Sequence, residues 1–122
     1  MERITKGDLQ LGDWVMVRME DGYMPNAEVK RISEDGVRVK ANNCSYFASW
    51  DDLYAIPITE DFVEANGLDA AINTNGENIR VMGDMVAVWQ DYSQKCRMRG
   101  IKNVHQVQHI MKLFGINQKI II

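Results

Sequence analysis

The sequence predicts an α+β protein of mainly β structure, with a small five-stranded barrel packed against a C-terminal unit of antiparallel strands and helices. Three observations lead to this fold class. Residues 11–58 contain short alternating stretches at intervals of about ten residues, which is typical of a small barrel. A tight hairpin is indicated around Gly83-Asp84, and residues 104–114 repeat apolar side chains at helical spacing.

The first predicted domain, residues 1–58, contains five strands joined by turns. Two turn-forming pairs lie close together, so a loop is expected over residues 21–26. Apolar side chains change face between Val29 and Ile32, which indicates either a bulge or the end of a strand. Gly36 is expected to supply a positive φ in the hairpin that follows. The strands are expected over residues 14–19, 27–32, 37–41, 46–50 and 54–58.

Three sequence blocks lie at the start of the first strand, in the second strand and before the last: Gly12-Asp13-Trp14-Val15, Ala27-x-Val29 and Trp50-Asp51-Asp52-Leu53. They resemble the corresponding parts of an SH3-like barrel of the Tudor type. That resemblance implies an aromatic rim at the barrel mouth, formed by Trp14, Tyr23, Phe47 and Trp50. Such a rim binds a cationic ligand through its ring faces, and a neighbouring Asp51 or Asp52 would help. The alternative is that these rings pack in the small core or at its edge.

The second predicted domain, residues 59–122, begins with a short helix. Thr59 is a suitable N-cap for this helix, and Gly67 is suited to the position that ends it. A two-residue turn at Gly83-Asp84 then joins two strands whose apolar side chains share one face, which supports this register. The expected pairs are Met82 with Met85, Val81 with Val86, and Ile79 with Val88.

The rest of this domain is expected to contain a strand, a helix and a terminal strand. In the strand over residues 94–99, Cys96 and Met98 point inward. The helix over residues 104–114 ends at Gly115. The apolar end of the chain, Ile120 to Ile122, is expected to add a strand to a sheet or to form a homodimer contact.

Composition describes an ordinary soluble protein of 122 residues, with 46% apolar side chains and a net charge of −3. No apolar stretch approaches the roughly 20 residues that cross a bilayer, so we expect no membrane span. The N-terminus lacks the apolar segment of a signal peptide, which indicates a cytoplasmic protein. Cys44 and Cys96 are far apart in the sequence and are interpreted as buried or half-buried thiols, not as a disulfide or a metal site.

Charge is distributed unevenly along the chain. All 17 acidic residues lie in the first 91 positions, whereas the last 31 hold both histidines and several cations. Alternating cations with an aromatic residue nearby predict a nucleic-acid or anion-binding surface, because their spacing is close to that of phosphates along a strand. The residues of this candidate site are Arg80, Trp89, Lys95, Arg97, Arg99 and Lys102. The alternative is a solvated face, or pairing with Glu77, Asp84 and Asp91.

Signatures of catalysis are absent from the sequence, which has no phosphate-binding loop, nucleophile elbow or zinc-ligand cluster. His105 and His109 lie four residues apart on one helix face, but the sequence offers no third ligand beside them. Asp51 and Asp52 are neighbours on the chain and are not expected to converge on one bond. We therefore predict a protein that is not an enzyme and that needs no metal or cofactor.

Two further blocks, Ile56-Pro57-Ile58-Thr59-Glu60 and the segment from Ile101 to Gln108, resemble a family of short proteins from anaerobic gut bacteria. Genes of that family often lie near mobile or phage-derived genes, and no activity is established for it, so the resemblance implies no catalytic residues. The predicted function is an accessory binding module that contacts protein or nucleic acid. The alternative is a structural or assembly protein that self-associates through its C-terminal strand.

Overall fold

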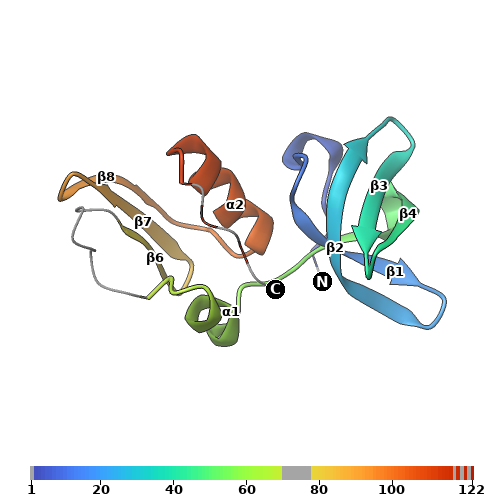
Figure 1. The fold of residues 1–122 in the computed structure, drawn as a ribbon, viewed down its shortest axis with the longest axis horizontal. Coiled ribbons are helices and arrows are strands. Elements are labelled where there is room, and N and C mark those ends of the chain that lie inside the picture. The colour runs from blue at the N-terminus through green and yellow to red at the C-terminus, as the bar shows by residue number, and fades with distance from the viewer. Residues whose placement is uncertain (1, 70–77, 117, 119, 121) are drawn as a thin grey trace. The chain divides into compact units, whose positions relative to one another are not determined.

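The structure is a computed structural model that describes residues 2–69, 78–116, 118, 120 and 122 (Figure 1). The chain divides into two compact units. Unit 1 comprises residues 1–56 with Ile122, and unit 2 comprises residues 57–121. The division falls at Pro57, beside the boundary expected after residue 58.

Unit 1 is built around one antiparallel sheet of five strands in the order β4-β3-β2-β1-β5. The first strand therefore lies between the second and the last, which returns to pair with it. Short 3-10 turns, η1 (Lys6–Asp8) and η2 (Trp50–Asp52), precede β1 and β5. The strands are β1 (Trp14–Met19), β2 (Gly22–Ile32), β3 (Gly36–Ala41), β4 (Cys44–Ser49) and β5 (Leu53–Ala55).

Alternate side chains of these strands form the core of unit 1, as period-two patterning predicts. In β3, Val37 and Val39 are fully buried while Arg38 and Lys40 are exposed. The buried set also includes Ile4, Leu9, Val15, Val17, Ala27, Val29, Ala41, Ala48, Leu53 and Ala55. This core cluster is aliphatic, and the aromatic side chains of unit 1 are half-buried or exposed around it, except for Tyr54, which is buried.

The loop predicted over residues 21–26 is wrong, because β2 runs without interruption through Pro25 and Asn26. The turn lies earlier, at Glu20 and Asp21, and the pairing register of β1 with β2 shifts between Val15 and Val17. Proline has no N–H to give to a ladder, and a bulge accommodates it without a lost hydrogen bond.

A second irregularity of β2 shows that the change of face between Val29 and Ile32 is a bulge and not the end of the strand. Val29 pairs with Val39, whereas Arg31 pairs with Arg38, so one extra residue is inserted in β2. A bulge increases local twist and bends the strand. The two bulges together allow the long second strand to pair with β1 over one half and with β3 over the other.

The two last strands of unit 1 are shifted from their predicted ranges. Asn42 and Asn43 both have positive φ and form a tight turn, so Ala41 pairs with Cys44 and β4 begins two residues early. Trp50 leaves the strand and begins η2. The last strand ends at Ala55 instead of residue 58. Ile58 already belongs to unit 2, where its N–H donates to the carbonyl of Lys102.

Unit 2 contains a three-stranded antiparallel sheet in the order β6-β7-β8 and two helices. The predicted hairpin register is confirmed for all three pairs around Gly83-Asp84. A positive φ at Gly83 is consistent with that tight turn. The elements are α1 (Glu60–Ala65), β6 (Asn78–Met82), β7 (Met85–Gln90), β8 (Ser93–Met98) and α2 (Val104–Leu113).

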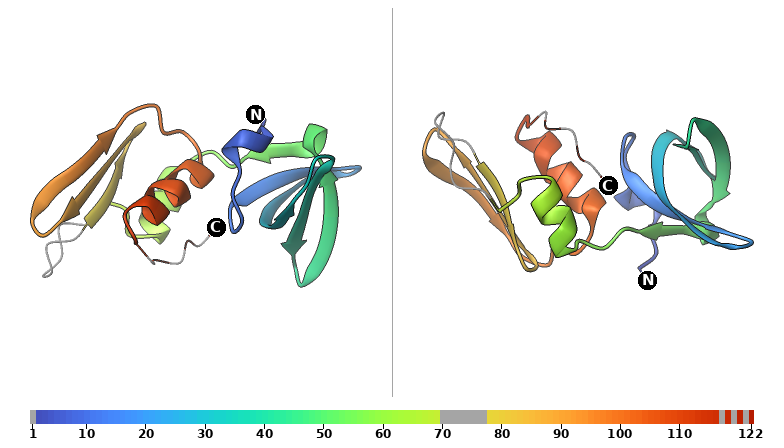
Figure 2. Two further views of the ribbon diagram at one scale, coloured as in Figure 1. Left: turned by 90° about the horizontal axis from the view of Figure 1, so that it is seen from above. Right: turned by 60° about the horizontal axis from the view of Figure 1, so that its bottom comes forward.

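Both helices lie on the same side of this sheet, as two views agree (Figures 1 and 2). They are delimited as predicted: the Thr59 hydroxyl accepts the Phe62 N–H at 3.1 Å, and Gly115 follows α2 with a positive φ. Apolar side chains from the helices and from one face of the sheet are buried: Phe62, Ile79, Val81, Val86, Val88, Val104, Val107, Ile110 and Met111. No helix in the described ranges has the length and apolar character to cross a bilayer.

The strand predicted at the apolar end of the chain is not seen among the residues described there, 116, 118, 120 and 122. Residues 117, 119 and 121 lie outside the described part of the chain. Ile120 is only 5% exposed, whereas Ile122 is 39% exposed. Ile120 is therefore covered by its own chain.

Candidate nucleic-acid interface

One face of the three-stranded sheet carries three of the five predicted cations and points away from the helices. The side chain of Gln90 donates to the carbonyl of Phe114, the C-cap of α2, at 2.8 Å, so Gln90 and its alternate neighbours in β7 face α2. The remaining side chains of β7 face the opposite way. We name this surface the open face and define it by Arg80, Met82, Met85, Ala87, Trp89, Lys95 and Arg97.

A row across the three strands forms the centre of the open face. Arg80 of β6 lies opposite Ala87 of β7, and Ala87 lies opposite Arg97 of β8. Because neighbouring strands lie about 4.8 Å apart, the Cα atoms of the two arginines are roughly 10 Å from each other. Ala87 is fully buried although it is on this face, as expected for a small side chain between two long ones. The row therefore holds two guanidinium groups over a smooth apolar centre.

Arg97 is held across this surface by a contact with its neighbour strand. Its Nε donates to the Sδ of Met85 at 2.9 Å. The stem of Arg97 therefore leans over β7, and the terminal nitrogens of the guanidinium form no hydrogen bond with a residue that the structure describes. An arginine placed in this way still has both terminal nitrogens with which to donate two hydrogen bonds to an anion.

A bulge in β8 brings Lys95 next to Trp89. Val88 pairs with Cys96 and Trp89 pairs with Gln94, so Lys95 is the extra residue of β8. Lys95 therefore lies between the two residues of β8 that pair with Val88 and Trp89, and it directly follows Gln94, the partner of Trp89. Lys95 and Arg97 are also two residues apart along β8, so their Cα atoms are about 6.5–7 Å apart. Trp89 is half-buried, so part of its ring remains accessible.

The open face is not neutralised by described acidic residues. Ion pairs occur in unit 1, between Arg3 and Asp51, Lys6 and Glu34, Arg18 and Asp52, and Lys30 and Glu28. The hydrogen bond from Arg18 to Asp52 also raises the pKa of this arginine. By contrast, Arg80, Lys95 and Arg97 form no ion pair with any residue that the structure describes.

Two of the three acids considered as partners for these cations are placed in turns. Asp84 and Asp91 are exposed, in the β6–β7 and β7–β8 turns, and neither pairs with a described cation. The third, Glu77, lies outside the described residues. Asp84 and Asp91 therefore do not neutralise the cations of the open face.

The structure brings together four of the six predicted site residues: Arg80, Trp89, Lys95 and Arg97. The other two lie beyond the sheet. Arg99 follows the last residue of β8, and Lys102 lies in the loop before α2, where its backbone N–H donates to the Gln106 side chain. Both are exposed.

The predicted aromatic rim is distributed over separate elements of unit 1. Trp14 is in β1, Tyr23 is the second residue of β2, Phe47 is in β4 and Trp50 is in η2. The indole N–H of Trp50 donates to the carbonyls of Ser33 and Glu34, which ties it to the β2–β3 turn. Tyr23 instead stacks edge-on against Tyr54, at 5.6 Å between ring centroids. Tyr54 was not among the predicted rim residues, because its place in β5 opposite Met16 depends on the pairing of the last strand with β1.

The histidines and cysteines do not assemble a site in the described part of the chain. His105 and His109 are neighbours in α2, with ring centroids 5.5 Å apart, and His105 is buried. No described cluster of three or more His, Cys, Asp or Glu side chains could hold a metal ion. Both cysteines are free thiols, and Cys96 is half-buried, but Cys44 is exposed, because it begins β4 directly after the Asn42-Asn43 turn.

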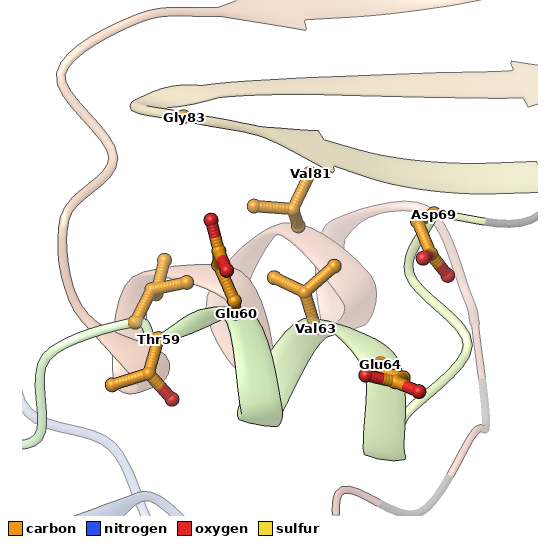
Figure 3. A pocket seen from close by; sticks show the side chains of 8 residues that line it. Thr59, Glu60, Val63, Glu64, Asp69, Val81 and Gly83 are labelled. Atoms are coloured by element: carbon orange, nitrogen blue, oxygen red, sulfur yellow. The ribbon is translucent and has the colours of Figure 1, made fainter.

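Sequence reasoning missed two features. The first is a pocket of about 400 Å³ between α1 and β6 with three acidic side chains, Glu60, Glu64 and Asp69 (Figure 3). The i, i+4 spacing of the two glutamates was the only signal for it. The second is a cationic row on the outer side of unit 1, where Arg31 lies opposite Arg38 and Arg38 lies opposite the exposed Phe47. That row depends on the β2 bulge.

Fold and site together define a mainly β protein of two units with a cationic, helix-free sheet face in the second. Comparison with models of known protein families, with curated proteins and with solved structures found no match.

Proposed function

We propose that the protein is a non-enzymatic accessory module that binds nucleic acid through the open face of unit 2. Arg80, Lys95 and Arg97 contact phosphates, and Trp89 provides an apolar contact between them. The observation that carries this proposal is the convergence of the three cations on one helix-free face, where they form no ion pair with a described residue.

The contrast between the two units supports an anionic ligand. In unit 1, several cations are paired with carboxylates, which is typical of a solvated surface with balanced charge. The open face instead presents like charges near one another, and a counterion or a polyanion relieves their repulsion. The net charge of −3 opposes tight nonspecific binding, so we expect moderate affinity that decreases with salt.

We propose that unit 1 is an SH3-like barrel and forms the second part of this module. Support comes from the order β4-β3-β2-β1-β5, from the bulges that bend β2 and from the 3-10 turn before β5. The separate positions of the predicted rim residues give no reason to assign it a cation-binding cage, so we place the nucleic-acid contact in unit 2.

The test measures binding of a fluorescently labelled oligonucleotide to the whole chain by anisotropy, at several salt concentrations. A triple variant, Arg80→Gln, Lys95→Gln and Arg97→Gln, removes three positive charges from the open face. Each lost phosphate contact is expected to reduce the slope of log affinity against log salt by about 0.7–0.9, so the triple variant should reduce it by about 2–3.

The matched control is Arg31→Gln, Arg38→Gln and Lys40→Gln, which removes the same charge from exposed positions in unit 1. It should keep most of the slope and affinity. Equal effects of the two triple variants would show a response to net charge alone, and absence of binding at low salt would overturn the proposal.

A further inference from the structure

We infer that the open face is built for single-stranded nucleic acid, with an unpaired base stacked on Trp89. This inference rests on the proposed function, since it names the ligand class of the same surface. Three features of the surface carry it: the place of Trp89 in the sheet, the bulge beside it, and the arrangement of cations around it.

Trp89 lies on the central strand of the sheet, where flanking strands support it on both sides. Its neighbours across the ladder are Asn78 of β6 and Gln94 of β8. The end of β7 is fixed to α2 by the Gln90 bond to Phe114, which anchors the backbone next to the indole. A tryptophan on a rigid sheet, half-buried and not covered by either helix, is a platform on which a flat ring can stack.

The side chains around Trp89 favour a base next to a phosphate. Lys95 is brought beside the indole by the β8 bulge, and Arg97 follows it at the spacing of alternate strand residues, about 6.5–7 Å. Met85, which is in contact with Arg97, adds polarizable apolar surface to the same face. A strand of nucleic acid presents this combination, with charged phosphates along one side and ring faces along the other.

A duplex fits these features less well. In a duplex the ring faces are stacked on neighbouring base pairs, so an indole on a sheet can reach only edges and backbone unless a step is opened at a cost. The phosphate contacts alone would then remain, and Trp89 would contribute little. In a single strand, every base has a ring face that can leave its neighbours and stack on an aromatic side chain.

The test combines a change in the protein with a change in the ligand. Wild-type chain and Trp89→Ala are each titrated with labelled oligothymidylate, with the same strand carrying abasic sites, and with a duplex of equal length. For wild type, oligothymidylate should bind about 5- to 150-fold more tightly than the abasic strand, the range expected for stacking of one base. For Trp89→Ala this ratio should fall close to one, while duplex binding should change little.

Trp89→Phe serves as the second variant, because it keeps an aromatic ring in the sheet and should retain part of the preference for bases. Circular dichroism and thermal unfolding verify that each variant is folded. The comparison of base-containing and abasic strands on wild-type protein needs no variant, so it decides the question even if Trp89→Ala unfolds.

The outcomes separate this inference from the proposed function. Salt-dependent binding that is equally strong for duplex, abasic and intact strands would keep the phosphate contacts and overturn the stacking. A base preference that persists in folded Trp89→Ala would also overturn it, and would place the stacking elsewhere, for example at Phe47 beside Arg38. Absence of all binding would overturn the proposed function itself.

Discussion

Gly36 begins β3 at a point where the backbone of β4 comes very close. A Cβ built on this residue would overlap the carbonyl oxygen of Ala48 and would lie 2.9 Å from the Cα of Ser49. Both groups belong to the paired backbone, so neither can move away as a flexible side chain could. Gly36 was expected to have a positive φ, and its φ is 158°. The close approach of the neighbouring strand is nevertheless the stronger reason for a glycine at this position.

Gly36→Ala is therefore expected to lower the free energy of unfolding by about 1–3 kcal/mol, as overpacking of a tight site does. Urea unfolding followed by circular dichroism measures the loss. Gly7→Ala is the control, since an added Cβ there meets nothing within 4 Å and φ is not in the left-handed region. If Gly36→Ala were as stable as Gly7→Ala, the close approach of β3 and β4 at this point would be wrong.

At the scale of elements, α1 depends on its cap more than a longer helix would. It has six residues, too few to be stable in isolation, and Phe62 is its one buried residue. The Thr59 hydroxyl accepts the Phe62 N–H and so satisfies one of the helix's free donors. Glu60 and Asp61 in the first turn add a favourable interaction with the helix dipole.

Replacing the cap by Thr59→Ala is expected to lower the free energy of unfolding by about 1 kcal/mol. The change should appear in urea unfolding and as faster hydrogen exchange at the amide of Phe62. Thr59→Ser keeps a hydroxyl in the same place and should retain most of the stability. A serine variant as unstable as the alanine variant would indicate that the threonine methyl group, rather than the hydrogen bond, stabilises this end of the helix.

Elements were predictable where two independent signals agreed. The β6–β7 register followed from the turn at Gly83-Asp84 and from the apolar face together, and all three pairs are confirmed. In β2 the signals conflicted, because Pro25 and Asn26 favour a turn while the strand continues through a bulge. Local propensity could not resolve this, since the pairing with β1 that holds the segment extended is a tertiary interaction.

The candidate site was predictable in part for the same reason. Alternation along one strand predicted that Lys95 and Arg97 share a face. The position of Arg80 opposite Ala87 followed from the hairpin register. The bulge that places Lys95 beside Trp89, and the end of β8 before Arg99, depend on where β8 pairs with β7, and no residue type marks those points.

For the whole molecule, the two units differ in how their charges are used. Unit 1 balances several of its cations with neighbouring carboxylates, and one of them, Arg18, donates two hydrogen bonds to Asp52. Unit 2 separates its charges instead: acidic side chains line the pocket between α1 and β6, while cations occupy the open face of the sheet. This separation lets an acidic protein present a local cationic surface without a high overall charge.

The burial of Ile120 near the end of the chain bears on whether the whole protein is a binding module or an assembly protein. Self-association through residues 120–122 would require these apolar side chains to be available to a second copy. Ile120 is instead buried in the single chain at 5% exposure, so a partner is not needed to cover it. We therefore expect light scattering to give the mass of a monomer, 14.0 kDa, even at high protein concentration.

Ile120→Ala distinguishes the two roles of this side chain. If Ile120 packs within its own chain, the variant should lose about 2–5 kcal/mol of unfolding free energy, and the unfolding temperatures of both proteins should be independent of concentration. Ile122→Ala is the matched control, because that side chain is 39% exposed and should matter much less. An interface between copies would instead make the wild-type unfolding temperature rise with concentration and make Ile120→Ala abolish that rise. Such a result would favour the assembly protein and would require the open face to be tested in the oligomer.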